Sequence, residues 1–414
     1  MSHVGEEAMR PRVFGAGPAV RRPWGETAAG EAPDALSLYV HIPYCAHRCA
    51  FCDLSAGRPS GPEEPLAYVT AIRREIVRAA EEEPLLRGRP ALSAYFGGGT
   101  PTAMQPEGLA GVLWLLRDQF QLPDGAETTV EADPGTVSQE ALWALRQAGF
   151  NRISFGVQSL EDAVLRRLGR IHDAARARAA VAEAAAEGFG QISVDLILGL
   201  PQVTPEVWRR TVAEVVTWPI THLSVYALQV EEGTAFGRRQ RAGRLGLPPD
   251  DLVVEMGDEA EGLAAGAGFE RYELSSYARP GGRCLHNEGY WTGRAYRGLG
   301  AGAHSYLDGE RRWNLRSPRR YIAAVVGGLS PVEGSERLAP AEARAEAAVL
   351  ALRRDRGIER RAFMRAFGSD PADAFAAPLT RLRAAGLVVV SDERISLTVR
   401  GRWLYNQVAG ALLP

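Results

Sequence analysis

The stretch YVHIPYCAHRCAFCDLS, residues 39–55, joins the end of an apolar run to a group of cysteines. Cys45, Cys49 and Cys52 follow C-x3-C-x2-C spacing, so three of the four cysteines in the chain fall within eight positions. The apolar run predicts a strand, and the cysteines follow it directly. In barrels of alternating strands and helices, the loops after the strands form the active-site face. We therefore expect a functional site at the carboxyl end of this strand.

Short apolar runs alternate with helical patterns from this stretch as far as residue 230. The runs are LSLYVHI (36–42), ALSAYFGG (91–98), ETTVEAD (127–133), RISFGVQS (152–159), ISVDLILGL (192–200) and HLSVYALQV (222–230). The segments between them are rich in strong helix formers, with apolar residues at helical spacing. Repeated units of this kind predict an α/β fold with a parallel sheet covered by helices. A complete or partial (β/α) barrel and a doubly wound sheet share this local pattern.

The two ends of the chain have different patterns from this central part. Residues 1–34 are rich in Gly, Ala, Pro and Arg without a helical or strand period, and we expect a disordered extension. We expect a first domain over residues 35–316 and a second over 317–414. The second domain is predicted to be mostly helical to residue 385, with a hairpin turning at Asp392-Glu393 and a last helix. This order suggests a winged-helix-like module that packs on the protein or covers a substrate.

Composition excludes several classes of protein. With 46% hydrophobic residues, 24% charged residues and a formal net charge of −2, the chain resembles an ordinary globular protein without a general preference for nucleic acid. It contains no apolar run long enough for a membrane span and no signal-peptide pattern, so we expect a cytoplasmic protein. All 48 basic residues are arginine, which excludes a Schiff-base lysine and a Walker A loop.

Clustered cysteines in a cytoplasmic chain indicate metal binding or catalysis rather than disulfides. Thiolates hold iron–sulfur clusters, and a cubane with three protein ligands leaves one iron open for another molecule. The alternative is a zinc site completed by His41, His47 or Cys284. Zinc sites commonly use two separate C-x2-C pairs, a pattern that this stretch lacks.

Several other residues after or inside the predicted strands suit a small ligand. The run Gly97 to Thr100 follows the second strand, where glycines let the backbone approach a ligand, although such a run is often only a tight turn. Glu131 and Gln158 end the third and fourth strands, while Asp195 lies inside the apolar fifth strand. These acids suit a ribose or an ammonium group, or they form buried pairs with arginine.

Arg170, in the segment LGRIH, has two interpretations as well. Its guanidinium is suited to a bidentate pair with a carboxylate. The alternative is a solvated arginine at a helix end.

The cysteine spacing, with Phe51 before the third cysteine, resembles the signature of the radical S-adenosylmethionine (SAM) superfamily. The resemblance implies a partial (β/α) barrel with a [4Fe-4S] cluster on Cys45, Cys49 and Cys52. It further implies that the open iron binds the amino and carboxylate groups of SAM, whose reductive cleavage yields a 5′-deoxyadenosyl radical.

The segments YVHIPYC, GGGTP, VEADP, ISFGVQS, LGRIH and DLILGLP resemble one branch of that superfamily, the oxygen-independent coproporphyrinogen III oxidases and the related heme chaperones. The C-terminal module resembles the small domain appended in that branch. The resemblance places Phe51 near the adenine of SAM. The full set of SAM-site residues that it implies is Tyr39, Phe51, Gly98, Gly99, Thr100, Glu131, Gln158, Arg170 and Asp195.

Two features favour the heme chaperones within this branch. The oxidase pattern has a further cysteine two positions after the third, whereas here Asp53 and Leu54 follow Cys52. The stretch CLHNEGYW, residues 284–291, also contains the H-N-x-x-Y-W motif of the heme-chaperone group.

The motif offers several groups to heme. His286, Cys284 or Tyr290 could ligate iron, and Trp291 offers a flat apolar face to a macrocycle. On chemistry alone, a polar loop whose aromatic residues belong to the core explains the stretch better. The resemblance favours heme for the motif as a whole. His304 is a further candidate ligand or a turn residue.

We therefore expect a heme chaperone that transfers heme to acceptor hemoproteins such as respiratory-chain components, and that carries the cluster and SAM. The resemblance also allows a homodimer and peripheral contact with a membrane. The alternatives are coproporphyrinogen III oxidase, a radical SAM methyltransferase, and an interaction protein with structural zinc.

Overall fold

The computed structural model describes residues 35–54 and 56–414. The predicted disordered extension, residues 1–34, lies outside the described residues. Six parallel strands pair in chain order, and each matches one of the predicted apolar runs. They are β1 (Leu36–Ile42), β2 (Ala91–Gly98), β3 (Glu127–Ala132), β4 (Arg152–Gln158), β5 (Gln191–Leu198) and β6 (His222–Ala227).

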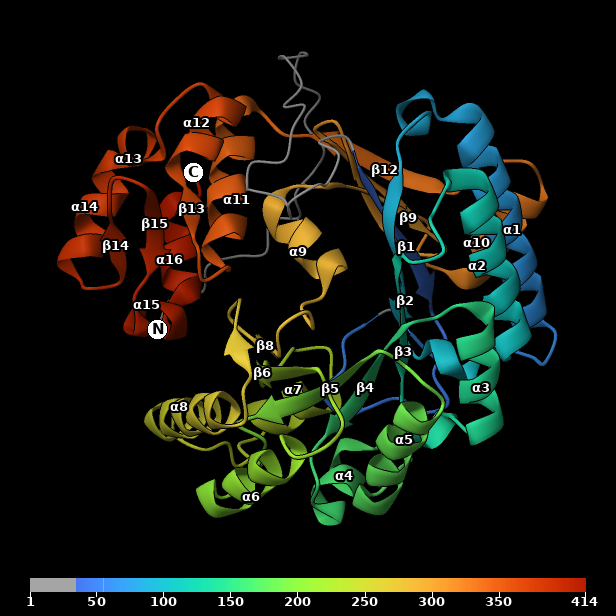
Figure 1. The fold of residues 1–414 in the computed structure, drawn as a ribbon, viewed down its shortest axis with the longest axis horizontal. Helices are drawn as coiled ribbons and strands as arrows, with labels where there is room; N and C mark the ends of the chain where they lie inside the picture. The colour runs from blue at the N-terminus through green and yellow to red at the C-terminus, as the bar shows by residue number, and fades with distance from the viewer. Residues whose placement is uncertain (1–34, 55) are drawn as a thin grey trace.

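This strand order decides between the two predicted architectures. In a doubly wound sheet the order reverses at a switch point, whereas here each strand lies beside its predecessor. The sheet curves without closing, and the helices cover its outer face (Figure 1). The expected partial barrel is confirmed. The covering helices include α1 (Glu64–Glu82), α2 (Pro106–Phe120), α3 (Gln139–Ala148), α4 (Asp162–Leu168), α5 (Ala174–Ala186), α6 (Pro205–Val215), α7 (Ala235–Arg241) and α8 (Asp250–Gly266).

Side chains along each strand alternate between an apolar outer face and a polar inner face of the sheet. Val40, Phe96 and Val130 are fully buried in the main hydrophobic core. Their neighbours Tyr39 and Tyr95 stack on each other inside the barrel, with ring centroids 6.3 Å apart. Because side chains alternate along a strand, the apolar face packs on helices while the polar face lines the interior. The fold therefore brings polar groups together at the barrel centre.

The sheet continues beyond the six parallel strands on both sides. β9 (Ala295–Leu299) pairs parallel with β1, and β10 (His304–Leu307), β11 (Glu310–Asn314) and β12 (Val332–Arg337) extend that edge. β8 (Ser276–Ala278) and β7 (Glu270–Arg271) extend the edge at β6. Twelve strands thus form one sheet in the described part of the chain. These six strands were not predicted from the sequence.

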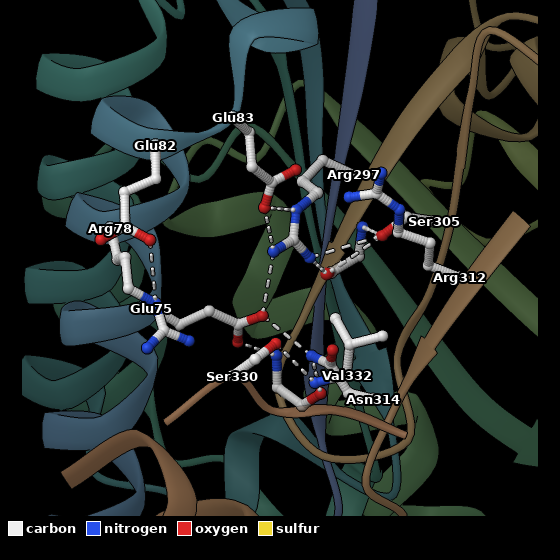
Figure 2. A network of polar contacts seen from close by, with 12 residues as sticks. Glu75, Arg78, Glu82, Glu83, Arg297, Ser305, Arg312, Asn314, Ser330 and Val332 are labelled. Carbon is white, nitrogen blue, oxygen red and sulfur yellow. Dashed lines mark hydrogen bonds and ion pairs between the residues drawn. The ribbon is translucent and has the colours of Figure 1, made fainter. Parts of the chain in front are cut away.

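A buried polar network fastens this extension to α1. The Glu75 carboxylate, 1% exposed, accepts hydrogen bonds from Arg297 (3.2 Å), Asn314 (2.8 Å), Tyr321 (2.6 Å) and the Gly300 amide (2.9 Å). Figure 2 shows Glu75, Arg297 and Asn314 converging between the helix and the strands. A buried carboxylate is tolerated when its charge is paired and its lone pairs are used. This network therefore joins segments that lie far apart in the sequence.

A second hydrophobic core forms the C-terminal domain. Its hairpin, β14 (Val388–Val390) and β15 (Arg394–Leu397), has the predicted turn. The other elements are α11 (Pro340–Leu352), β13 (Ile358–Glu359), α12 (Arg360–Phe367), α13 (Pro371–Ala374), α14 (Ala376–Ala384), α15 (Val399–Trp403) and α16 (Tyr405–Leu412).

The division between the two cores differs from the expected boundary at residue 317. Helix α10 (Pro318–Val326) packs on α1 and contributes Tyr321 and Val325 to the first core, and β12 belongs to the large sheet. The second core begins with α11, which lies beside α9 (Leu285–Thr292) (Figure 1). None of the helices in the described ranges is long and apolar enough to cross a membrane.

Candidate functional site

The cysteine loop follows β1 and is held in place by backbone hydrogen bonds. The Cys45 amide donates to the Gly57 carbonyl (3.0 Å), and the Ala50 amide donates to the Leu168 carbonyl at the end of α4 (2.9 Å). The Phe236 amide of α7 donates to the Ala50 carbonyl (2.9 Å). The thiols of Cys45, Cys49 and Cys52 are free and partly exposed. The fold therefore presents three thiols from a loop whose backbone is anchored on two helices.

Gly98 and Gly99 are required by the close approach of β2 to this loop. Gly98 has a φ of 114°, and a Cβ there would lie 2.6 Å from the His41 ring. A Cβ at Gly99 would lie 2.5 Å from the Tyr44 carbonyl oxygen and 3.0 Å from the Cys45 sulfur. The glycine run is therefore a cradle for the cysteine loop and more than a tight turn.

Thr100 completes this cradle. Its amide donates to the Tyr44 carbonyl (2.7 Å), and its hydroxyl lies 3.6 Å from the Cys45 sulfur. Both contacts hold the first cysteine against the end of β2.

Arg170 lies beside the second cysteine. Asp133 and Gly156, which hold it there, were not predicted from the sequence. The Arg170 guanidinium is 3.3 Å from the Cys49 sulfur, donates to the Gly156 carbonyl (2.6 Å) and pairs with Asp133 (2.5 Å). Asp133 also accepts a hydrogen bond from His172 (2.9 Å). Burial opposes ionisation of Asp133, but His172 and the charge of Arg170 hold its pKa below the usual range. The position of Asp133 directly after β3 is the sequence signal that could have identified it.

Glu131 and Asp195 lie on the inner face of the barrel. Glu131 accepts hydrogen bonds from the Tyr95 hydroxyl (2.7 Å) and the Gly98 amide (3.1 Å), and Asp195 accepts one from Ser154 (3.2 Å). Burial raises the pKa of Glu131 to about 7 and also raises the pKa of Asp195. Asp195, which lines the larger cavity, could therefore bind a cationic or hydroxyl-bearing ligand.

Gln158 and Tyr39 complete the predicted set. Gln158 ends β4 with a φ of 67°, a left-handed conformation that is costly for a residue with a side chain. The Tyr39 hydroxyl forms a hydrogen bond with Nδ1 of His41 (3.0 Å). Burial lowers the pKa of His41 to about 4, so this ring is neutral at pH 7.

Two adjoining cavities open beside the cysteine loop. The smaller, about 160 Å³, is lined by all three cysteines. The larger, about 660 Å³, shares Phe51, Cys52, Leu54 and Gln158 with it and continues past Asp195. Of the predicted SAM-site residues, Phe51, Gly98, Gly99, Thr100, Gln158 and Arg170 line the smaller cavity. Tyr39 and Glu131 lie outside both linings, behind His41 and Gly98.

The H-N-x-x-Y-W motif lies partly inside the barrel. Cys284 and His286 are 0% and 1% exposed. The His286 ring forms hydrogen bonds with the Ser93 hydroxyl (3.0 Å) and the Tyr290 hydroxyl (2.9 Å), which uses both ring nitrogens. Burial lowers its pKa to about 3. His286 therefore faces the barrel interior in this structure.

The amino end of the motif is bound to β3. Glu127 accepts hydrogen bonds from the Leu285 and His286 amides (both 2.9 Å), and the Cys284 thiol lies 3.6 Å from the same carboxylate. Burial raises the pKa of Cys284 to about 12, so the thiol stays protonated at neutral pH. A carboxylate that caps a helix start stabilises the helix.

The other aromatic residues of this region differ in accessibility. Tyr290 packs edge-on against Tyr296, with ring centroids 4.8 Å apart. Trp291 lies under the guanidinium of Arg353, which is 4.4 Å from the centre of its ring. His304 is exposed and stacks on Trp313 with a centroid distance of 6.1 Å.

The residues at the cysteine loop fit an iron–sulfur cluster. Two of the side chains that could complete a zinc site are engaged elsewhere, because the His41 ring is hydrogen-bonded to the Tyr39 hydroxyl and the Cys284 thiol lies beside Glu127. Three thiols on one anchored loop, beside a glycine cradle and an arginine, suit a cubane with one iron left for another ligand. Such a cluster would supply electron transfer to the molecule bound at that iron.

Comparison with known proteins agrees with this arrangement. The family model of the radical SAM superfamily matches residues 39–215, and that of the HemN C-terminal domain matches residues 338–404. The heme chaperone HemW of Mycobacterium tuberculosis is 37% identical over 91% of this chain and 95% of its own length. The heme chaperone HemW of Bacillus subtilis is 33% identical over 91% of this chain and 99% of its own.

A solved structure has the same fold over nearly the whole chain. Coproporphyrinogen III oxidase (HemN) from Escherichia coli superposes with a TM-score of 0.80 at 26% identity, covering 95% of this chain and 90% of that chain. Together with the cysteine loop and the open barrel, these matches make the chain a member of the radical SAM superfamily. Within that superfamily it belongs to the family of the heme chaperone HemW.

Proposed function

We propose that this protein binds heme and transfers it to acceptor hemoproteins, such as components of the respiratory chain. The observation that carries the proposal is its similarity, over nine-tenths of the chain, to proteins named heme chaperone. The H-N-x-x-Y-W motif at residues 286–291 supports it.

In this proposal, Cys45, Cys49 and Cys52 bind a [4Fe-4S] cluster whose fourth iron binds SAM. Arg170, positioned by Asp133, would pair with the SAM carboxylate while remaining beside Cys49. Phe51 would contact the adenine. The remaining SAM residues are Gly98, Gly99, Thr100, Gln158 and Asp195 near the cavities, with Tyr39 and Glu131 supporting them.

Heme binding would depend on α9 through four residues of the motif, Cys284, His286, Tyr290 and Trp291. His286 would have to exchange its bonds to Ser93 and Tyr290 before its ring could bind iron. The Trp291 ring lies under the guanidinium of Arg353. From the resemblance we also propose a cytoplasmic location, a homodimer and peripheral contact with a membrane.

The second candidate is coproporphyrinogen III oxidation, favoured by the structural match to HemN. Asp53 and Leu54 occupy the positions after Cys52, where the oxidase pattern continues to a further cysteine. This difference favours heme binding over oxidation.

Anaerobic reconstitution with iron and sulfide, followed by heme titration and a coproporphyrinogen assay with SAM and reductant, separates the two candidates. We expect saturable heme binding without decarboxylation. Efficient formation of protoporphyrinogen would contradict the chaperone proposal.

A further inference from the structure

A large cleft lies between the barrel and the C-terminal domain. It measures about 660 Å³, within the range of roughly 300–1,000 Å³ that is usual for pockets holding organic ligands. One wall comes from the ends of β5 and β6 and from the loop of Phe51 to Leu54, and the other from Arg353, Trp403 and Tyr405. We call it the interdomain cleft.

Apolar and charged side chains both line the interdomain cleft, and its carboxylates are Asp53, Asp195, Glu231 and Glu261. Leu228, Leu274, Tyr277 and Trp403 line it, and the side chains of Leu54 and Tyr226, which are 49% and 44% exposed, also face it. Large apolar side chains that remain exposed inside a concave site commonly mark a ligand-binding surface. The cleft therefore suits a flat apolar molecule.

Three arginines line the cleft, and they differ in how firmly they are paired. Arg271 is bound to Asp355 and to Glu261 (3.3 Å), and Arg402 is bound to the same Glu261 (3.2 Å). Arg353 is paired less firmly, with a 3.5 Å contact to the Glu273 carboxylate and a contact with the Tyr405 side chain. Its Nε is buried without an acceptor among the described residues. Arg353 is therefore the cation of the cleft with unused capacity to bind an anion.

Arg353 also connects the cleft to the heme motif. Its guanidinium lies 4.4 Å from the ring centre of Trp291 and 5.5 Å from that of Tyr405. Stacking between two aromatic rings restricts a guanidinium to one orientation. Trp291 thus holds Arg353 at the cleft, whereas His286 of the same motif is enclosed in the barrel.

We propose that the heme macrocycle packs on the wall of the interdomain cleft formed by Arg353, Trp403 and Tyr405, whereas Phe51, Gln158 and Asp195 on the other wall belong to the SAM site, and that Arg353 pairs with one heme carboxylate. The inference rests on the proposed function and assigns its ligand site. Heme matches the cleft because it combines a flat apolar ring with carboxylate side arms, whereas the enclosed His286 offers no comparable space. In this arrangement Trp291 is a positioning residue that acts through Arg353.

The test compares heme with heme dimethyl ester, which has the same ring but no free carboxylates. Full-length protein is titrated with each ligand and followed by visible absorption, with and without the reconstituted cluster. The unmodified protein should bind heme about tenfold more tightly than the ester. Arg353→Gln should lose this preference and retain the affinity for the ester.

Two further variants control the comparison. Arg361→Gln, an exposed arginine on α12, should keep the full preference for heme. Leu228→Trp, which fills the cleft, should weaken the binding of both ligands.

An Arg353→Gln variant that keeps the preference, or that loses heme and ester binding equally, would overturn the assignment of Arg353. Unchanged binding in Leu228→Trp would overturn the cleft itself. If the unmodified protein bound neither ligand, the proposed heme function would fail first, so the two failures are distinguishable.

Discussion

At the scale of single residues, Gly99 shows how closely β2 and the cysteine loop are packed. Its amide donates to the Ile42 carbonyl (2.7 Å), and a Cβ would overlap the Tyr44 carbonyl oxygen at 2.5 Å. No rotation of a side chain relieves a contact with backbone, so the loop itself would have to move.

Gly99→Ala should therefore reduce cluster assembly at least severalfold while the chain still folds, at a cost of about 1–3 kcal/mol in the free energy of unfolding. Iron and sulfide per chain after anaerobic reconstitution measure the effect. Gly61→Ala is the matched control, because no atom lies within 4 Å of a Cβ there. Normal cluster content in Gly99→Ala would show that the cradle is not needed.

The raised pKa of Glu131 predicts that the free energy of unfolding depends on pH. Burial, and next to it the charge of Asp195, raise its pKa to about 7, although Tyr95, the Gly98 amide and Arg152 oppose the shift. The folded chain therefore keeps this proton to a higher pH than the unfolded chain, and the resulting stability is lost as the pH rises through about 7.

In Glu131→Gln the side chain stays neutral at both pH values. The free energies of unfolding of the cluster-free variant and of the cluster-free unmodified protein should therefore differ more at pH 8 than at pH 5.5. We expect the variant to gain about 1–3 kcal/mol relative to the unmodified protein over this range. Thermal unfolding at both pH values measures the difference. An equal difference at the two values would contradict the raised pKa.

At the scale of elements, α1 and the added strands form one unit through Glu75. Its carboxylate is the common acceptor for Arg297 of β9 and Asn314 of β11 (Figure 2), and for Tyr321 of α10. Removing one partner from a buried charge network leaves the others unpaired, which is more costly than losing an exposed ion pair.

Glu75→Gln should lower the free energy of unfolding by about 3–5 kcal/mol. Glu82→Gln on the same helix is the control, since Glu82 forms only an exposed pair with Arg78 at 3.8 Å and should cost less than about 0.5 kcal/mol. Denaturant unfolding of both variants checks the prediction. Similar costs would mean that the network adds little stability.

At the scale of the whole molecule, the cavity at the cysteine loop adjoins the interdomain cleft and shares four lining residues with it. Cys52 lines both cavities, whereas Cys49 lines only the smaller of the two. The C-terminal domain is attached to the barrel near the cleft, where the Leu274 amide donates to the Arg353 carbonyl (3.0 Å).

Cys49→Ser should therefore abolish the intact cluster but retain most of the heme binding. Visible absorption after reconstitution reports the cluster, and heme titration of the same sample reports the second site. The unmodified protein, prepared in parallel, is the reference. Loss of both would indicate that the two sites are coupled.

Much of the barrel could be predicted from local sequence. The expected runs 36–42 and 91–98 coincide with β1 and β2, because strand residues alternate and turn residues end the runs. The cysteines and glycines of the candidate site were proposed from their place at the ends of the predicted strands. The extra strands were not predicted, and the pairing of β9 with β1 joins segments that are remote in the chain.

The sequence by itself determined the six parallel strands and the chemistry available at their ends, since periodicity and residue type are local properties, whereas the order of the strands in the sheet came from the tertiary structure. Only the tertiary structure decided which of these groups meet. It placed Arg170 at Cys49, enclosed His286 beside Ser93, and brought Arg353 over Trp291. Such contacts depend on how the whole chain buries its apolar surface, and no short segment contains that information.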